Sequence, residues 1–155
     1  MAALTWNDAL ALQQPHMDHT HREFVALLSD VEAAVEGPQD ELAERYALFL
    51  EHTEAHFAQE ERWMAAIGFA SENCHTYQHD HVLQVLREVQ RRLLEEGDVS
   101  TVHLLVLELA QWFPTHAQSM DAALAETMAE RGFDPDTSAM VLPPAYQALS
   151  LSTCG

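Results

Sequence analysis

Apolar residues recur along the chain at alternating steps of three and four, which is the spacing of an amphipathic α-helix. Glycine and proline divide this pattern into four long segments, at about 18–35, 39–67, 73–97 and 100–132. Because no segment alternates apolar and polar residues with a period of two, strands are not expected. Four helices with short connections and one narrow apolar stripe each predict an all-α fold, an up-down-up-down antiparallel four-helix bundle.

Some stripe positions, where a bundle core favours leucine or valine, are polar. They are His21, His56, Glu60, His75, His79 and His116. One buried histidine is usually a hydrogen-bonded core residue, but a buried carboxylate must be paired or bound because its burial alone is very costly. Mutual hydrogen bonds can hardly satisfy so many polar groups, whereas a metal ion takes imidazole lone pairs and carboxylate charge together. The stripes therefore favour a metal site.

The direction of the helices places these residues at one level of the bundle. His21 and the pair His75/His79 lie near the starts of their helices, while His56 and Glu60 lie near the end of theirs. Neighbouring helices run in opposite directions, so starts and ends meet. The i, i+4 spacing within the second and third helices also puts both members of each pair on one face.

Composition and charge narrow the function. Among 155 residues, 25 are acidic and 7 are basic, and the net charge of −18 argues against nucleic acid and anionic membrane surfaces as partners. The first residues lack the basic region of a signal peptide and no apolar run has transmembrane length, so a cytoplasmic location is expected. We expect one bundle domain over 1–132 and a C-terminal tail over 133–155 that is not a separate domain.

The histidine motifs resemble the hemerythrin family, most closely its single-domain bacterial members, over roughly Trp6 to Met128. They read MDHTH (17–21), HFAQEE (56–61), HTYQH (75–79) and WFPTH (112–116), followed by Asp121. The resemblance implies a di-iron site with seven ligands, which are His21, His56, Glu60, His75, His79, His116 and Asp121. In the family pattern, three histidines (75, 79, 116) hold one iron, two (21, 56) hold the other, and both carboxylates bridge. One position on the two-histidine iron then stays open, and in this family O2 binds there.

Asp121 does not follow from helical periodicity. A step of five residues turns about 140° on an ideal α-helix, so Asp121 and His116 do not share a face. Met120 is where the apolar stripe would continue. Placing Asp121 at the metals requires a distortion such as a π-bulge, for which Pro114 offers a cause. The alternative is that Asp121 is a solvent-exposed acid.

Other polar and aromatic residues are assigned more simply. Histidines off the stripes are expected to be exposed, although His19 or His81 could hydrogen-bond to a metal ligand; they are His16, His19, His52, His81 and His103. Five apolar residues are candidates for a wall around the open position, and core packing is their alternative role. They are Leu28, Trp63, Leu109, Trp112 and Phe113. The Pro-containing tail could cover the end of the bundle, bind a protein partner or be disordered.

These observations favour reversible O2 binding, for storage, delivery or sensing, over an enzyme. The alternative within the same resemblance is a di-iron oxidoreductase that acts on peroxide or nitric oxide, or a donor of iron for cluster repair. A third reading is an interaction module with vestigial ligands, which the full ligand set disfavours.

Overall fold

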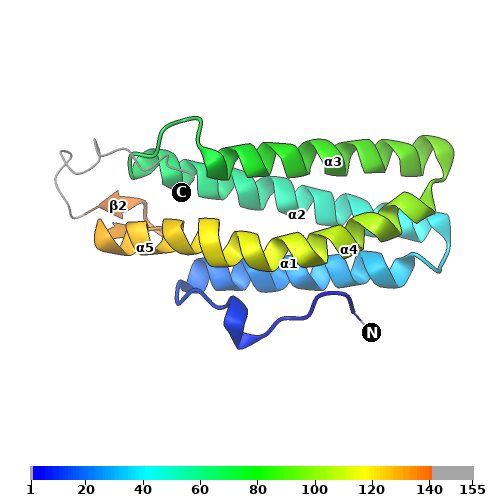
Figure 1. Ribbon diagram of the computed structural model, residues 1–155, viewed down its shortest axis with the longest axis horizontal. Coiled ribbons are helices and arrows are strands. Elements are labelled where there is room, and N and C mark those ends of the chain that lie inside the picture. The colour runs from blue at the N-terminus through cyan, green and yellow to red at the C-terminus, as the bar shows by residue number, and fades with distance from the viewer. Residues whose placement is uncertain (1, 141–155) are drawn as a thin grey trace.

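The computed structural model describes residues 2–140, and four antiparallel helical rods make up most of this part of the chain (Figure 1). The fourth rod consists of two α-helices joined by a π-helical segment. The elements are η1 (Asp8–Leu10), α1 (Pro15–Ala34), α2 (Gln39–Ala66), α3 (Cys74–Glu96), α4 (Val99–His116), η2 (Ala117–Asp121), α5 (Ala122–Glu130), β1 (Phe133–Asp134) and β2 (Ala139–Met140). The predicted all-α bundle is confirmed.

Local signals explain where the helices begin and end. The side chain of Asn73 accepts a hydrogen bond from the backbone N–H of Thr76. The hydroxyl oxygen of Thr76 in turn accepts one from the backbone N–H of Asn73, which closes a capping box at the start of α3. Gly97 ends α3 with φ of +64°, a conformation that favours glycine. Asp98, the next residue, caps the start of α4, because its side chain accepts a hydrogen bond from the backbone N–H of Thr101. With a connection this short, α3 and α4 must run antiparallel.

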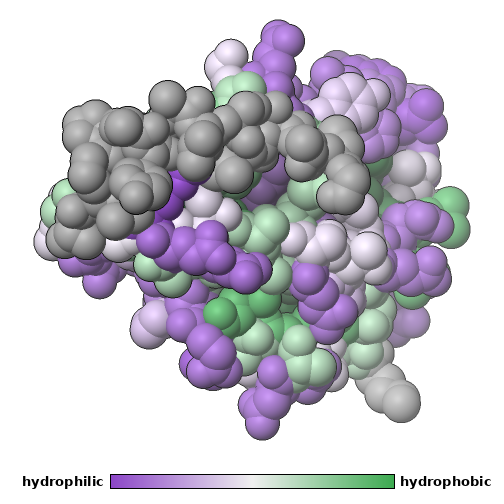
Figure 2. Space-filling view, turned by 60° about the vertical axis from the view of Figure 1, so that its left-hand side comes forward, coloured by the Kyte–Doolittle hydropathy of each residue, from purple (hydrophilic) through white to green (hydrophobic). Residues whose placement is uncertain are grey.

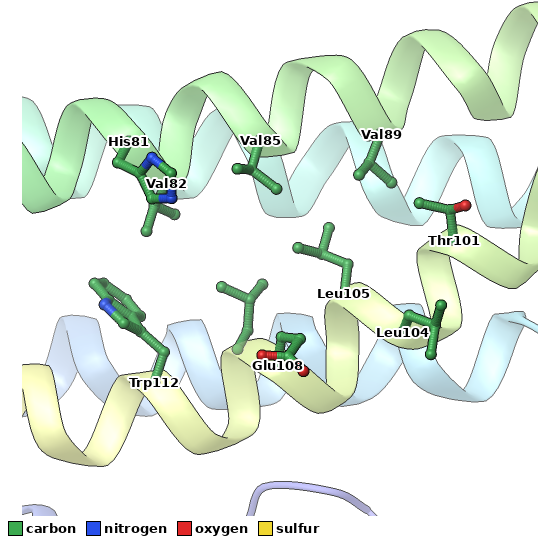
Figure 3. A pocket seen from close by; sticks show the side chains of 10 residues that line it. His81, Val82, Val85, Val89, Thr101, Leu104, Leu105, Glu108 and Trp112 are labelled. Atoms are coloured by element: carbon green, nitrogen blue, oxygen red, sulfur yellow. The ribbon is translucent and has the colours of Figure 1, made fainter.

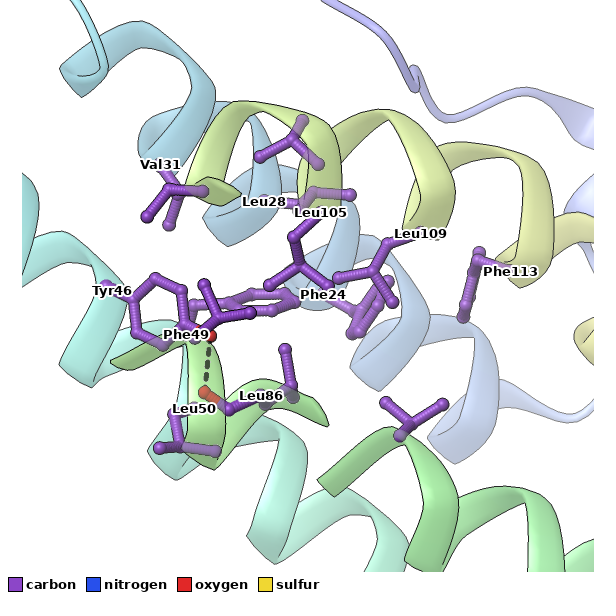
Figure 4. Packing of buried hydrophobic residues seen from close by; sticks show 14 of the residues in the cluster. Phe24, Leu28, Val31, Tyr46, Phe49, Leu50, Leu86, Leu105, Leu109 and Phe113 are labelled. Carbon is purple, nitrogen blue, oxygen red and sulfur yellow. Dashed lines mark hydrogen bonds between the residues drawn. The ribbon is translucent and has the colours of Figure 1, made fainter. Parts of the chain in front are cut away.

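The apolar interior is split into two clusters. The larger one, drawn in part in Figure 4, fills most of the bundle with residues such as Phe24, Phe49 and Leu86. Within it, the hydroxyl of Tyr46 donates a hydrogen bond to the carbonyl of Leu86 at 2.6 Å. The smaller cluster, which we call the end core, lies where α2 ends and contains Met17, Trp63, Met64, Ile67, Leu124, Ala125, Met128 and Phe133.

The expectation that the chain has no strands is wrong for one short segment. β1 and β2 form an antiparallel hairpin in which Phe133 pairs with Met140. Two-residue strands are too short to show a period of two, so the sequence pattern could not reveal them. Phe133 is buried in the end core, and the first part of the tail therefore packs on the bundle. Residues 141–155 lie outside the described residues, so the roles suggested above for the rest of the tail stay predictions.

Helix ends differ from the prediction by a few residues at most; α1, for example, begins at Pro15 rather than near Asp18. The face around the end of the bundle is largely hydrophilic in Figure 2, with small hydrophobic patches, as the large excess of acidic residues leads one to expect. Over residues 2–140, every helix is either too short or too polar to cross a membrane.

Candidate metal centre

Seven polar side chains form a buried layer inside the bundle. One of them comes from α1, two come from α2 and two come from α3. The last residue of α4 and the last residue of η2 complete the layer. All are at most 5% exposed: His21, His56, Glu60, His75, His79, His116 and Asp121. The structure thus brings together every residue that the sequence and the resemblance selected.

Both carboxylates lie among histidines from several helices. Glu60 is 2.7 Å from Nε2 of His56, 3.2 Å from Nε2 of His75 and 3.3 Å from Nε2 of His79. Asp121 is within 3.1 Å of the Nε2 atoms of three histidines, which are His21, His75 and His116. The inward atom of each of the five rings is therefore Nε2, and each carboxylate faces several rings at once.

The candidate ligand atoms fall into two overlapping groups. One group contains three histidines and the other contains two, and within each the atoms lie within 4.8 Å of one another. Glu60 and Asp121 belong to both groups. Two neighbouring groups of candidate ligands that share their carboxylates are therefore present, with unequal numbers of histidines.

Hydrogen bonding within the protein does not satisfy this layer. Apart from the bond between His56 and Glu60, the inward atoms lack hydrogen-bond partners in the described part of the chain, including both oxygens of Asp121. Each unpartnered buried polar atom costs about 1–3 kcal/mol. Imidazole nitrogens and carboxylate oxygens are donors that suit divalent transition-metal ions. The cluster therefore fits a metal site.

In the metal-free protein, protons on the histidines balance the negative charge of the two buried carboxylates. Burial disfavours a charged His21, but the Asp121 and Glu60 carboxylates outweigh burial and raise the pKa of His21 to about 10. The same competition raises the pKa of His75 to about 9. For Glu60 and Asp121, burial acts in the opposite direction, yet the surrounding histidines hold both pKa values well below the ordinary range. A metal ion that binds here must displace protons.

Two further side chains orient the rings. Glu61 lies 3.2 Å from Nδ1 of His79, and the amide oxygen of Gln78 lies 2.7 Å from Nδ1 of His116. Such contacts to the outer nitrogen hold Nε2 in its inward position. Sequence reasoning gave neither residue a role, although each stands inside a histidine motif, directly beside a candidate ligand.

Most of the remaining histidines lie where they were expected. His16, His19, His81 and His103 are exposed, so His19 and His81 do not support a ligand from inside the layer. The prediction is wrong for His52, whose side chain is only 17% exposed. Its ring packs 6.1 Å from that of His56, and its Nε2 lies 3.5 Å from Glu23.

Aromatic rings surround the polar layer. Phe57 stacks on His79 with ring centroids 3.9 Å apart, and Trp112 stacks on His116 at 4.3 Å. Phe113 meets His21 edge-on at 5.1 Å. Trp112 and Phe113 were among the predicted wall residues, whereas Phe57 was not. These rings limit the access of water to the layer.

A π-helical segment brings Asp121 inward. In η2, the backbone N–H of Ala122 donates to the carbonyl of Ala117, five residues back. The wider turn buries Asp121 completely and leaves Met120 partly exposed. The predicted distortion is confirmed, and the alternative of a solvent-exposed acid is wrong. Pro114 lies one turn earlier, inside α4, where it cannot donate a backbone hydrogen bond.

Comparison with known proteins agrees with this geometry. The family described as "Hemerythrin HHE cation binding domain" matches residues 14–127. The chain is similar to a bacteriohemerythrin of Ralstonia nicotianae, with 38% identity over 134 residues that cover 86% of this chain and 95% of the relative. Bacteriohemerythrins of Stenotrophomonas maltophilia and Pseudomonas aeruginosa are 27% and 26% identical, and the aligned regions cover 81% and 83% of this chain and 82% and 83% of those relatives.

Proposed function

This chain belongs to the hemerythrin family, and we propose that it binds O2 reversibly at a di-iron centre in the buried polar layer. The three-histidine group would hold one iron and the two-histidine group the other. Glu60 and Asp121, which belong to both groups, would serve both ions. The observation that carries the proposal is the pair of overlapping groups that share both carboxylates but differ by one histidine.

That difference gives the centre its function. Two ions held by the same carboxylates and by unequal numbers of imidazoles would not be equivalent. The ion at His21 and His56 would have one protein ligand fewer, which leaves room for a small ligand. A diferrous pair supplies the two electrons that reversible O2 binding requires. Histidine-rich coordination favours this role over the carboxylate-rich sites of di-iron oxidases, whose additional anionic donors stabilise higher oxidation states of iron.

The surrounding residues protect such a ligand. Phe113 and Phe24 pack against the rings of His21 and His56 on the apolar side of the layer, so bulk water does not reach the centre from there. Because a bound ligand leaves with the help of water and protons, a dry wall prolongs its lifetime. Glu61 and Gln78 keep the three-histidine group oriented meanwhile.

Visible absorption spectroscopy tests the proposal. The iron-loaded protein is reduced without air, exposed to O2 and then returned to argon, over several cycles. We expect an oxygen-dependent band that appears and disappears in each cycle. No such band, or direct conversion to a stable oxidised spectrum with consumption of reductant, would contradict reversible binding, and the second result would support a di-iron oxidoreductase.

A further inference from the structure

A pocket between α1 and α2 leads from the surface to the two-histidine group. It has a volume of about 290 Å³, and its inner lining includes His56 and Glu60. Its outer lining includes exposed residues such as His16, Ala55 and Arg62. The pocket therefore joins the solvent to the side of the centre where the proposed function needs a ligand to arrive.

Three residues that line this pocket carry buried polar atoms without partners. The indole nitrogen of Trp63 and the Nδ1 atoms of His52 and His56 are buried and have no hydrogen-bond partner within the described residues. Trp63 as a whole is only 2% exposed. An indole N–H can only donate, so it requires a hydrogen-bond acceptor. Of the residues that line the pocket, Trp63 therefore has an unused N–H, which a small ligand that accepts a hydrogen bond can satisfy.

His52 and Glu23 form one side of the mouth. Their side chains are 17% and 49% exposed, and the atoms Nε2 and Oε1 are 3.5 Å apart. The ring of His52 extends inward to within 6.1 Å of the ring of His56. The ring of His16, another lining residue, meets that of Trp63 edge-on, with ring centroids 5.0 Å apart. The side chains of Glu23, His52 and His16 thus border the outer end of the pocket.

Two other hollows in the surface lead elsewhere. The apolar groove between α3 and α4, lined by Val85, Leu105 and Trp112, touches none of the seven polar residues (Figure 3). The pocket beside Gln78 and Trp112 touches His116, which belongs to the three-histidine group. Neither includes His21, His56 or Glu60 in its lining.

We propose that the α1–α2 pocket is the entrance and waiting site for small hydrogen-bond-accepting ligands on their way to the two-histidine side of the centre. The inference rests on the proposed function, because it assigns His56 and Glu60 to the ion that takes the ligand. An entrance changes the height of the barrier between solvent and centre but not the stability of the bound state. Association and dissociation rates must then change by the same factor.

Ligand kinetics test this directly. Azide, a small hydrogen-bond-accepting anion that coordinates ferric ions, is mixed by stopped flow with the oxidised iron-loaded protein. Ala55→Phe narrows the mouth and should slow association and dissociation about tenfold each, a barrier increase of about 1.4 kcal/mol, at unchanged Kd. His52→Ala widens the mouth and should accelerate both. Gln111→Phe, at the mouth of the pocket beside His116, is the matched control and should change neither.

A second readout needs no iron. In a Trp6→Phe, Trp112→Phe background, Trp63 is the single tryptophan, and quenching of its fluorescence by acrylamide in the metal-free protein reports entry into the pocket. Ala55→Phe should lower the quenching rate and Gln111→Phe should not. If Ala55→Phe slows the quenching but the unchanged iron-loaded protein does not bind O2 reversibly, the entrance is retained and the proposed function is rejected. Unchanged quenching and azide rates in Ala55→Phe, or slowing by Gln111→Phe alone, would overturn the entrance.

Discussion

Gln78 contacts no candidate iron ligand atom directly, yet its removal should weaken metal binding. Its amide oxygen lies 2.7 Å from Nδ1 of His116. A carbonyl oxygen can only accept a hydrogen bond, so Nδ1 carries the proton and Nε2 keeps its lone pair. Nε2 in turn lies 3.1 Å from Asp121. In Gln78→Leu, the ring loses the contact that sets its tautomer and its orientation.

The expected magnitude follows from how such contacts act at metal sites. Loss of a residue that orients a ligating histidine lowers metal affinity about 10–100-fold. This corresponds to about 1.4–2.8 kcal/mol of binding free energy. The effect should be smaller than the loss of His116 itself, because the imidazole is still present and can reorient. The fold should be unaffected, since Gln78 is only half-buried.

The assay is a titration with Co²⁺ in competition with a chelator of known affinity. Protein-bound Co²⁺ has visible absorption bands, so its binding can be followed directly. Gln111→Leu is the control, because Gln111 is exposed near the same surface pocket and has no contact with a candidate ligand. Gln78→Glu, which keeps the acceptor, should restore most of the affinity. If Gln78→Leu and Gln111→Leu bind Co²⁺ equally well, the argument that Gln78 orients His116 is refuted.

Three further predictions concern the ligand set, the pH dependence and the bundle core. His56→Ala should lose at least one iron per chain in a metal assay, whereas the exposed His103→Ala should keep both; the reverse would mean that the helix faces are misassigned. In the metal-free protein, the raised pKa values of His21 and His75 mean that their protonation stabilises the fold fully below pH 6.5, and that this contribution is lost as the pH rises through about 9 and then about 10. The melting temperature of the metal-free protein should therefore fall over this range, and that of the metal-loaded protein should fall much less; equal curves would contradict it. Tyr46→Phe removes a buried 2.6 Å hydrogen bond between α2 and α3 and should cost about 1–2 kcal/mol in chemical denaturation, where no change would show that the bond contributes nothing.

The sequence predicts the polar layer well because helical periodicity determines which residues face inward. His56 and Glu60, one turn apart, share a face in any regular helix, and short connections fix the directions of the neighbours. Asp121 is the exception, because helical periodicity does not select it and only the family resemblance did. The π-helical segment explains how a residue five positions after His116 still reaches the layer.

Other features depend on contacts between helices that periodicity does not contain. Gln78 and Glu61 lie at the edge of the apolar stripes, so their positions resemble those of ordinary surface residues. His52 is off the stripe of α2, but it contacts Glu23 of the neighbouring α1, and its side chain is only 17% exposed. The β1–β2 hairpin depends on the burial of Phe133 against the bundle rather than on its own short pattern.

Anomalous X-ray scattering from crystals of the iron-loaded protein, measured just above the iron absorption edge, tests the central claim most directly. The account predicts two anomalous peaks inside the bundle, one among His75, His79 and His116 and the other beside His21 and His56, with Glu60 and Asp121 between them. A single peak, or iron bound outside this layer, would contradict the di-iron centre and the function that we derive from it.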